Sequence, residues 1–183
     1  MRKTLTLTAA ALAAVIFFVL ATLPPRPTRL AAAGGPAGRT LAGAYHVHSL
    51  RSDGGGDRAA IAAAAARAGL GFVILTDHGD GTRRPEPPAY VGGVLLVDAV
   101  EVSTAGGHYT ALGVEEAPYP LGGEPEGVIE DVARLGGFGF AAHPDSPRAE
   151  VAWSAWEAPL DGLEWLNADS EWRNETRTRL ARV

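Results

Sequence analysis

The 183-residue chain contains no cysteine and a single lysine, Lys3. The absence of cysteine excludes a small domain held together by disulfide bonds. With 46% hydrophobic and 20% charged residues, the composition is that of a globular protein, so collagen-like and fully disordered chains are excluded as well. The sequence also contains no internal repeat.

Acidic residues are missing from residues 1–33, which hold four basic ones: Arg2, Lys3, Arg26 and Arg29. The remaining 150 residues carry 12 basic and 21 acidic side chains, a net charge near −9. A body this acidic has no electrostatic reason to bind nucleic acid, so we expect no such partner. An anionic substrate would need a local source of positive charge.

Arg2 and Lys3 are followed by an apolar run of about 20 residues, long enough to cross a bilayer. We expect residues 1–23 to be a signal peptide or a transmembrane anchor, and the Pro-, Ala- and Gly-rich residues 24–42 to be a tether. The basic start favours a body, residues 43–183, outside the cytoplasm. The protein is therefore expected to be exported, either anchored in the membrane through an uncleaved segment or secreted or periplasmic after cleavage.

The body alternates predicted strands and helices. Helices are expected at residues 57–69 and 127–137, each closed by glycine. An apolar run at 71–78 is typical of a buried parallel strand. Similar runs predict strands at 42–48, 92–103, 108–114, 138–144 and 161–167. This order predicts an α/β fold with a largely parallel sheet, open or closed into a barrel, in which functional residues lie at the carboxyl ends of strands.

All five histidines lie at the ends of predicted strands: His46, His48, His78, His108 and His143. Exposed positions outnumber strand ends several-fold, so scattered surface histidines would not show this pattern. Alternate residues of a strand share a face, so His46 and His48 can direct both imidazoles at one point while Val47 packs behind them. One such histidine is more often a core or turn residue, but the set together favours a metal centre.

Three carboxylates are interleaved with these histidines. Asp53 lies in a glycine-rich segment that can fold back over His48, although an ordinary turn Asp has the same setting. Asp77 precedes His78 and is expected to orient a ligand. Glu101 can bridge two cations with its two oxygens. So many groups exceed the needs of one tetrahedral zinc ion, which predicts two or more divalent ions of zinc, manganese or iron.

Five segments, in this order, resemble the PHP (polymerase and histidinol phosphatase) family of metal-dependent phosphoesterases. They span residues 45–167 and read YHVHSLRSDG, VILTDHGDG, VEVSTAGGHYTALGV, FAAHPDSP and DGLEWLN. The third segment and the last two are most similar to the branch of CehA/McbA-type hydrolases. The resemblance implies a distorted seven-stranded β/α barrel with two or three divalent metals at its mouth.

The resemblance also implies roles for individual residues. The metal ligands it carries over are His46, His48, Asp53, His78, Glu101, His108 and His143. It places Glu164 and Asn167 near the mouth of the barrel, where we expect substrate contact. The family closes its site with a late Asp-x-His, and none follows Asn167. We therefore expect an incomplete barrel that forms the amino-terminal part of a longer protein.

The expected activity is hydrolysis of a small-molecule ester. A water bridging the metals would lose a proton near neutral pH and attack a phosphate mono- or diester. His143 is the candidate proton donor for the leaving group, and Arg51, with Arg83 and Arg84, is a candidate phosphate contact. A carboxylic or carbamic ester is an alternative substrate, and an exported metal-binding module without catalysis is a second alternative. Amidohydrolase barrels that use a carbamylated lysine are excluded, because Lys3 lies in the export segment.

Overall fold

The computed structural model describes residues 11–18 and 40–173 of the chain. Contacts divide the chain into a compact unit of Gly38–Asn167 and a second unit that combines Met1–Ala37 with Ala168–Val183. In the second unit the described residues, 11–18 and 168–173, are helical. Among the described residues no helix combines the length and apolar character needed to cross a membrane. Most of the predicted signal or anchor and of the predicted tether lies outside the described residues.

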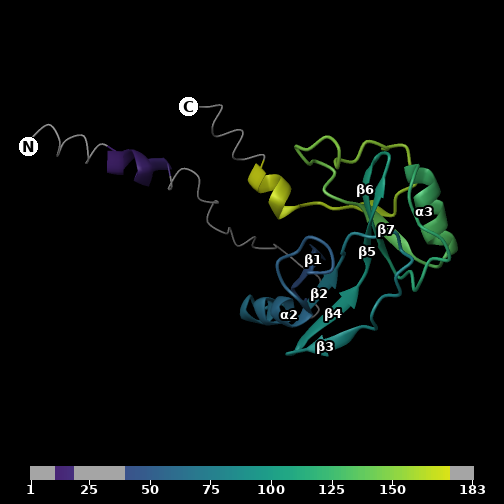
Figure 1. Ribbon diagram of the computed structural model, residues 1–183, viewed down its shortest axis with the longest axis horizontal. Helices are drawn as coiled ribbons and strands as arrows, with labels where there is room; N and C mark the ends of the chain where they lie inside the picture. Colours follow the sequence, from purple (N-terminus) through teal and green to yellow (C-terminus); the bar gives the residue numbers. More distant parts are fainter. Residues whose placement is uncertain (1–10, 19–39, 174–183) are drawn as a thin grey trace, which may run out of the picture. The chain divides into compact units, whose positions relative to one another are not determined.

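The first sheet of the larger unit has the strand order β1-β2-β4-β3. Its strands are β1 (Gly43–Val47), β2 (Phe72–Leu75), β3 (Ala89–Val91) and β4 (Val94–Asp98). The first three in that order pair in parallel, and β3 adds an antiparallel edge. Helix α2 (Arg58–Arg67) lies beside this sheet in Figure 1. It packs Ala62 and Ala65 into the same core cluster as the buried side chains of β2 and β4. The helix begins where predicted, because the side chain of Asp57 caps it by accepting a bond from the Ala60 nitrogen at 2.8 Å.

The second sheet has the order β5-β6-β7-β8. Its strands are β5 (Val100–Thr104), β6 (Gly107–Leu112), β7 (Phe138–Ala141) and β8 (Gly162–Leu163). Strands β5, β6 and β7 are antiparallel neighbours, and β8 pairs in parallel with β7. Helix α3 (Pro125–Arg134) lies beside this sheet in Figure 1 and contributes Val128, Ile129 and Val132 to its core.

The two sheets are joined where β2 ends. Only Ala99 separates β4 from β5, so these two strands form one interrupted segment that belongs to both sheets. Beyond β2, His78 forms a parallel bridge with Glu101, and the Gly79 nitrogen donates to the Glu101 carbonyl at 3.1 Å. The carboxyl end of β2 is thereby held directly against the start of β5.

The predicted helices and strands are present, but their pairing differs from the prediction in two ways. The run at 92–103 is two strands, and β3 had no counterpart in the sequence analysis. The sheets are also not largely parallel, because three of their six strand pairings are antiparallel. Only two residues connect β5 to β6, enough for a hairpin but far too few for the crossover that a parallel pair requires. The described residues thus form two joined four-stranded sheets, and a seven-stranded barrel is not shown.

Candidate metal centre

Strand alternation decides which side chains of the second sheet face the site. Val102 and Tyr109 belong to the core cluster that includes α3. Glu101 and its strand partner Thr110 therefore project from the opposite face, which we call the inner face. Ser103 and its partner His108 share that face for the same reason.

Two histidines reach the inner face only through unusual backbone. Among the described non-glycine residues, positive φ occurs at His46 (61°) and His143 (29°) alone. The pairing of β1 with β2 shifts register between Ala44 and Val47, so Tyr45 and His46 both turn inward while Val47 packs against the α2 core. Ala141 lies in the α3 core, so regular alternation would send His143 to that side as well. Strain of this kind is typical of functional sites.

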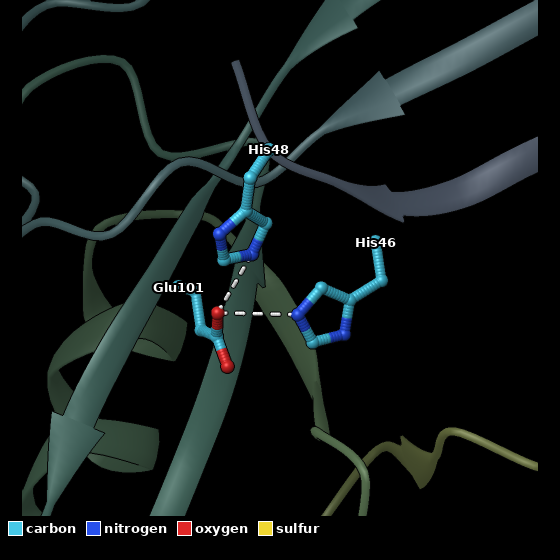
Figure 2. Close-up of side chains that lie close together, drawn as sticks. All are labelled: His46, His48 and Glu101. Atoms are coloured by element: carbon cyan, nitrogen blue, oxygen red, sulfur yellow. Dashed lines mark ion pairs between the residues drawn. The ribbon is translucent and has the colours of Figure 1, made fainter. Parts of the chain in front are cut away.

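The five imidazoles converge on the carboxylate of Glu101, which is 1% exposed. Its Oε2 lies 3.1 Å from His46 Nε2, 2.9 Å from His48 Nε2 and 3.3 Å from His78 Nδ1 (Figure 2 shows the first two). Its Oε1 lies 2.8 Å from His108 Nδ1 and 2.8 Å from His143 Nε2. We call this arrangement the histidine ring.

Neighbouring rings follow one another around Glu101 without a gap. Their centroids lie 4.6–5.3 Å apart in the closed order His46, His48, His78, His108, His143 and back to His46. Residues that are up to 97 positions apart in the sequence thus form one site. The five predicted histidines therefore lie together, and their binding of metal stays a prediction.

The donor atoms of the ring suit divalent cations. Glu101 Oε2 and His48 Nε2 are buried and form no hydrogen bond within the described part of the chain, although they lie only 2.9 Å apart. Neutral imidazole nitrogens and carboxylate oxygens in this density are the ligands that zinc, manganese and iron accept. Three overlapping groups have ligand atoms within 4.8 Å of one another: His46, His48 and Glu101; His48, Asp53 and His78; and His78, Glu101 and His108.

These groups include every predicted ligand except His143. That residue touches the same carboxylate through Nε2, and its buried Nδ1 has no hydrogen-bond partner among the described residues. Its predicted roles as ligand and proton donor stay predictions.

Carboxylates outside the ring hold two of the imidazoles. His46 Nδ1 lies 3.0 Å from Glu164 Oε2, and His48 Nδ1 lies 2.6 Å from Asp53 Oδ1. A proton on each Nδ1 satisfies these bonds, and a cation bound inside the ring would take the place of any proton on each Nε2. Ser103 Oγ, 3.3 Å from His108 Nε2, makes a similar outer contact. Ser103 was not among the predicted site residues, although its position two residues after Glu101 on one strand places both on one face.

The charge distribution of the site shifts several pKa values. Burial raises the pKa of a carboxyl group, but the imidazoles packed against both of its oxygens outweigh this effect and hold the pKa of Glu101 far below its usual range. Burial alone would lower the pKa of His46, yet the adjacent carboxylates of Glu101 and Glu164 raise it to about 9. For His78, burial dominates and lowers the pKa. The ring therefore combines a firmly ionised carboxylate with imidazoles of contrasting basicity.

The site opens to solvent on one side. The side chains of His78 and Asp53 are 36% and 68% exposed, whereas that of His46 is 5% exposed. The exposed side of the ring is therefore the one that carries Asp53 and His78.

The other predicted site residues lie outside the ring. Asp77 does not contact Glu101 and binds the backbone nitrogen and hydroxyl of Ser49. Arg51 and Arg83 bind the buried carboxylate of Asp98 at 2.9 and 3.3 Å. Both arginines also line a cavity of about 310 Å³ that His78 touches, so their contact with a phosphate stays a prediction.

Of the last three predicted substrate residues, one lies away from the ring and two reach it. Arg84 lies 3.5 Å from Glu116, away from the ring. Glu164 contacts His46 and the backbone nitrogen of His143, and Asn167 Nδ2 donates to Glu164 Oε1 at 3.0 Å. Glu164 and Asn167 thus reach the ring, and substrate contact for either stays a prediction.

Several solved structures resemble this one, including the following two. A protein of Bifidobacterium adolescentis, provisionally named a metal-dependent phosphoesterase, is 16% identical over 77% of this chain and 84% of its own length, with a TM-score of 0.50. A two-domain protein of Bacteroides vulgatus that contains a predicted PHP-like metal-dependent phosphoesterase is 19% identical, with a TM-score of 0.45. This chain spans only 47% of the second protein. At such identities the first likeness shows a shared fold and no more.

No protein-family model matches the chain. No curated protein matches it either.

Proposed function

We propose that this protein is a metal-dependent hydrolase of the PHP type that cleaves phosphate mono- or diesters. The observation that carries the proposal is the convergence of five imidazoles on the one buried carboxylate of Glu101. The shared fold with a protein named as a metal-dependent phosphoesterase supports it. We also propose that it belongs to the CehA/McbA-type branch and acts outside the cytoplasm, as its sequence motifs suggest.

The residues of the chain divide the work of such a site. His46, His48, His78, His108, Glu101 and Asp53 would hold divalent ions, with Glu101 shared between groups. Ions bound there would supply positive charge to the ester oxygens and lower the pKa of a coordinated water. That positive charge is the local attraction for an anionic ester that the acidic body otherwise lacks.

The exposed rim at Asp53 and His78 would admit the ester, and the buried side at His46 would keep water out. Glu164 and Asp53 would keep the protons of His46 and His48 on Nδ1, so that each Nε2 stays available inside the ring. Each of these roles uses a contact that exists without substrate.

Metal analysis of the purified protein, coupled to a screen of phosphate, carboxylic and carbamic esters with and without a chelator, tests the proposal. We expect bound zinc, manganese or iron, and phosphoesterase activity that chelation abolishes and metal restores. Turnover that survives thorough chelation with every substrate would refute the mechanism.

Variants separate the remaining alternatives. Glu101→Gln keeps the size of the side chain but removes the shared charge, so metal content and rate should both fall, as they should for His46→Ala. Glu130→Ala, on the exposed face of α3, should change neither. Bound metal without turnover of any ester would favour a metal-binding module, and turnover of carboxylic or carbamic esters alone would favour the alternative hydrolase.

A further inference from the structure

Resting on the proposed function, we infer that Glu164 is a positioning residue that sets both strained histidines of the ring. Its carboxylate does not belong to the ring around Glu101. It lies behind the ring, just after β8, where the backbone nitrogen of Glu164 donates to the Ala141 carbonyl at 2.9 Å. The side chain is 6% exposed, so its contacts are protected from water.

One oxygen of Glu164 serves both histidines. Oε2 accepts a hydrogen bond from His46 Nδ1 at 3.0 Å and another from the backbone nitrogen of His143 at 2.7 Å. These are the two residues whose positive φ turns them onto the inner face. A non-glycine backbone in that region is strained and persists only where its surroundings hold it. The contacts of Glu164 supply such a hold at both positions.

The remaining oxygen fixes the carboxylate itself. Asn167 Nδ2 donates to Oε1 at 3.0 Å, which orients Oε2 toward the two histidines. Burial alone would raise the pKa of Glu164. The hydrogen bonds from its three donors outweigh burial and hold the pKa below its usual value. The carboxylate is therefore a charged acceptor, the stronger kind of hydrogen-bond partner.

Glu164 also joins the two ends of the strand order. β1 is an edge of the first sheet and β8 an edge of the second, and no described backbone pairing links them. The bond from Glu164 to His46 crosses between these edges, over 118 positions of sequence. A residue at the β8 edge of the second sheet thus orients the His46 ring, whose Nε2 lies 3.1 Å from Glu101 Oε2.

The test compares full-length wild type with Glu164→Ala, Glu164→Gln and the surface control Glu130→Ala. Zinc affinity is measured by competition with a chelator, and folding of the metal-free proteins by circular dichroism. In the zinc-loaded proteins, NMR follows the exchange of the His46 Nδ1 proton, assigned by its loss in His46→Gln. None of these readouts needs substrate.

We expect Glu164→Ala to weaken zinc binding about 10- to 100-fold and to expose the His46 Nδ1 proton to rapid exchange. Glu164→Gln retains an oxygen acceptor, so it should lose less than about 10-fold and keep the protected proton. Glu130→Ala should match wild type.

Unchanged zinc affinity and a protected proton in a folded Glu164→Ala protein would overturn the inference. Should that variant fail to fold, Glu164→Gln decides: wild-type affinity together with rapid exchange of the proton would overturn it equally. A wild type that binds no divalent metal would instead refute the proposed function, so the two failures are distinguishable.

Discussion

The carboxylate of Asp77 binds Ser49 twice, through Oδ1 to the backbone nitrogen at 2.7 Å and through Oδ2 to the hydroxyl at 2.7 Å. Ser52 Oγ adds a third bond to Oδ1 at 2.8 Å. These bonds fix the turn between His48 and Asp53, both predicted ligands. Asp77 therefore acts on the site by holding the backbone between these two residues.

Replacing Asp77 with Ala should destabilise the protein by about 1–3 kcal/mol, because it leaves the buried Ser49 nitrogen without an acceptor. Metal affinity should fall with it, since the turn no longer fixes His48. Urea denaturation and chelator competition measure the two effects. Ser52→Ala removes only one of the three bonds and should cost about 1 kcal/mol or less. Equal stability of Asp77→Ala and wild type would contradict this role.

The gathering of the histidines could be predicted from the sequence because strand ends that follow apolar runs meet at one edge of a sheet. β2 itself ends at Leu75, so Asp77 and His78 lie beyond the strand and period-two alternation does not fix where their side chains point. The position of Glu164 beside His46 could not be predicted in this way, because it depends on how two sheet edges approach each other.

The positive φ values of His46 and His143 also have no signal in the sequence. Neither is a glycine or an asparagine, the residues that mark such conformations. The contact of Arg51 with Asp98 could not be predicted from the sequence either, because the two residues are 47 positions apart. By contrast, Gly106 between β5 and β6, with Gly107 directly after it and the short spacing there, was a hairpin signal, which the expectation of a largely parallel sheet overrode.

Stability of the metal-free protein should depend on pH through His46. Its pKa is raised to about 9 from 6.5, so the histidine contributes fully below pH 6.5, and the contribution is lost as the pH rises through about 9. The shift corresponds to about 3 kcal/mol. Denaturation in the presence of chelator should therefore show wild type losing stability between pH 6.5 and 9. His46→Gln should lose less over this interval, and parallel curves for the two proteins would contradict the assignment.

Asp98 is the centre of a buried ionic cluster. Its side chain is 1% exposed and accepts bonds from Arg51, Arg58 and Arg83 and from the backbone nitrogen of Glu86. Asp98→Ala strands three guanidinium groups and should cost about 3–5 kcal/mol of stability.

Glu86 provides a control within the same cluster. It pairs with Arg51 and Arg58, but its side chain is 47% exposed, so solvent screens both pairs. When the stability of both variants is measured by urea denaturation, Glu86→Ala should therefore cost about 1 kcal/mol or less. A loss as large as that of Asp98→Ala would show that the exposed carboxylate, and not the buried one, holds the arginines.

Two glycines should respond to alanine with opposite signs. A Cβ at Gly139, in β7, would lie 2.5 Å from the ring of Tyr109 and closer still to the Thr110 carbonyl oxygen. Because Tyr109 is fully buried, neither neighbour can move away freely, and Gly139→Ala should cost about 1–3 kcal/mol. A Cβ at Gly127, in α3, meets nothing within 4 Å, so Gly127→Ala should stabilise the helix by about 0.5–1 kcal/mol. Thermal denaturation of the two variants measures both effects, and a stabilising Gly139→Ala would contradict the packing of Tyr109 across β7.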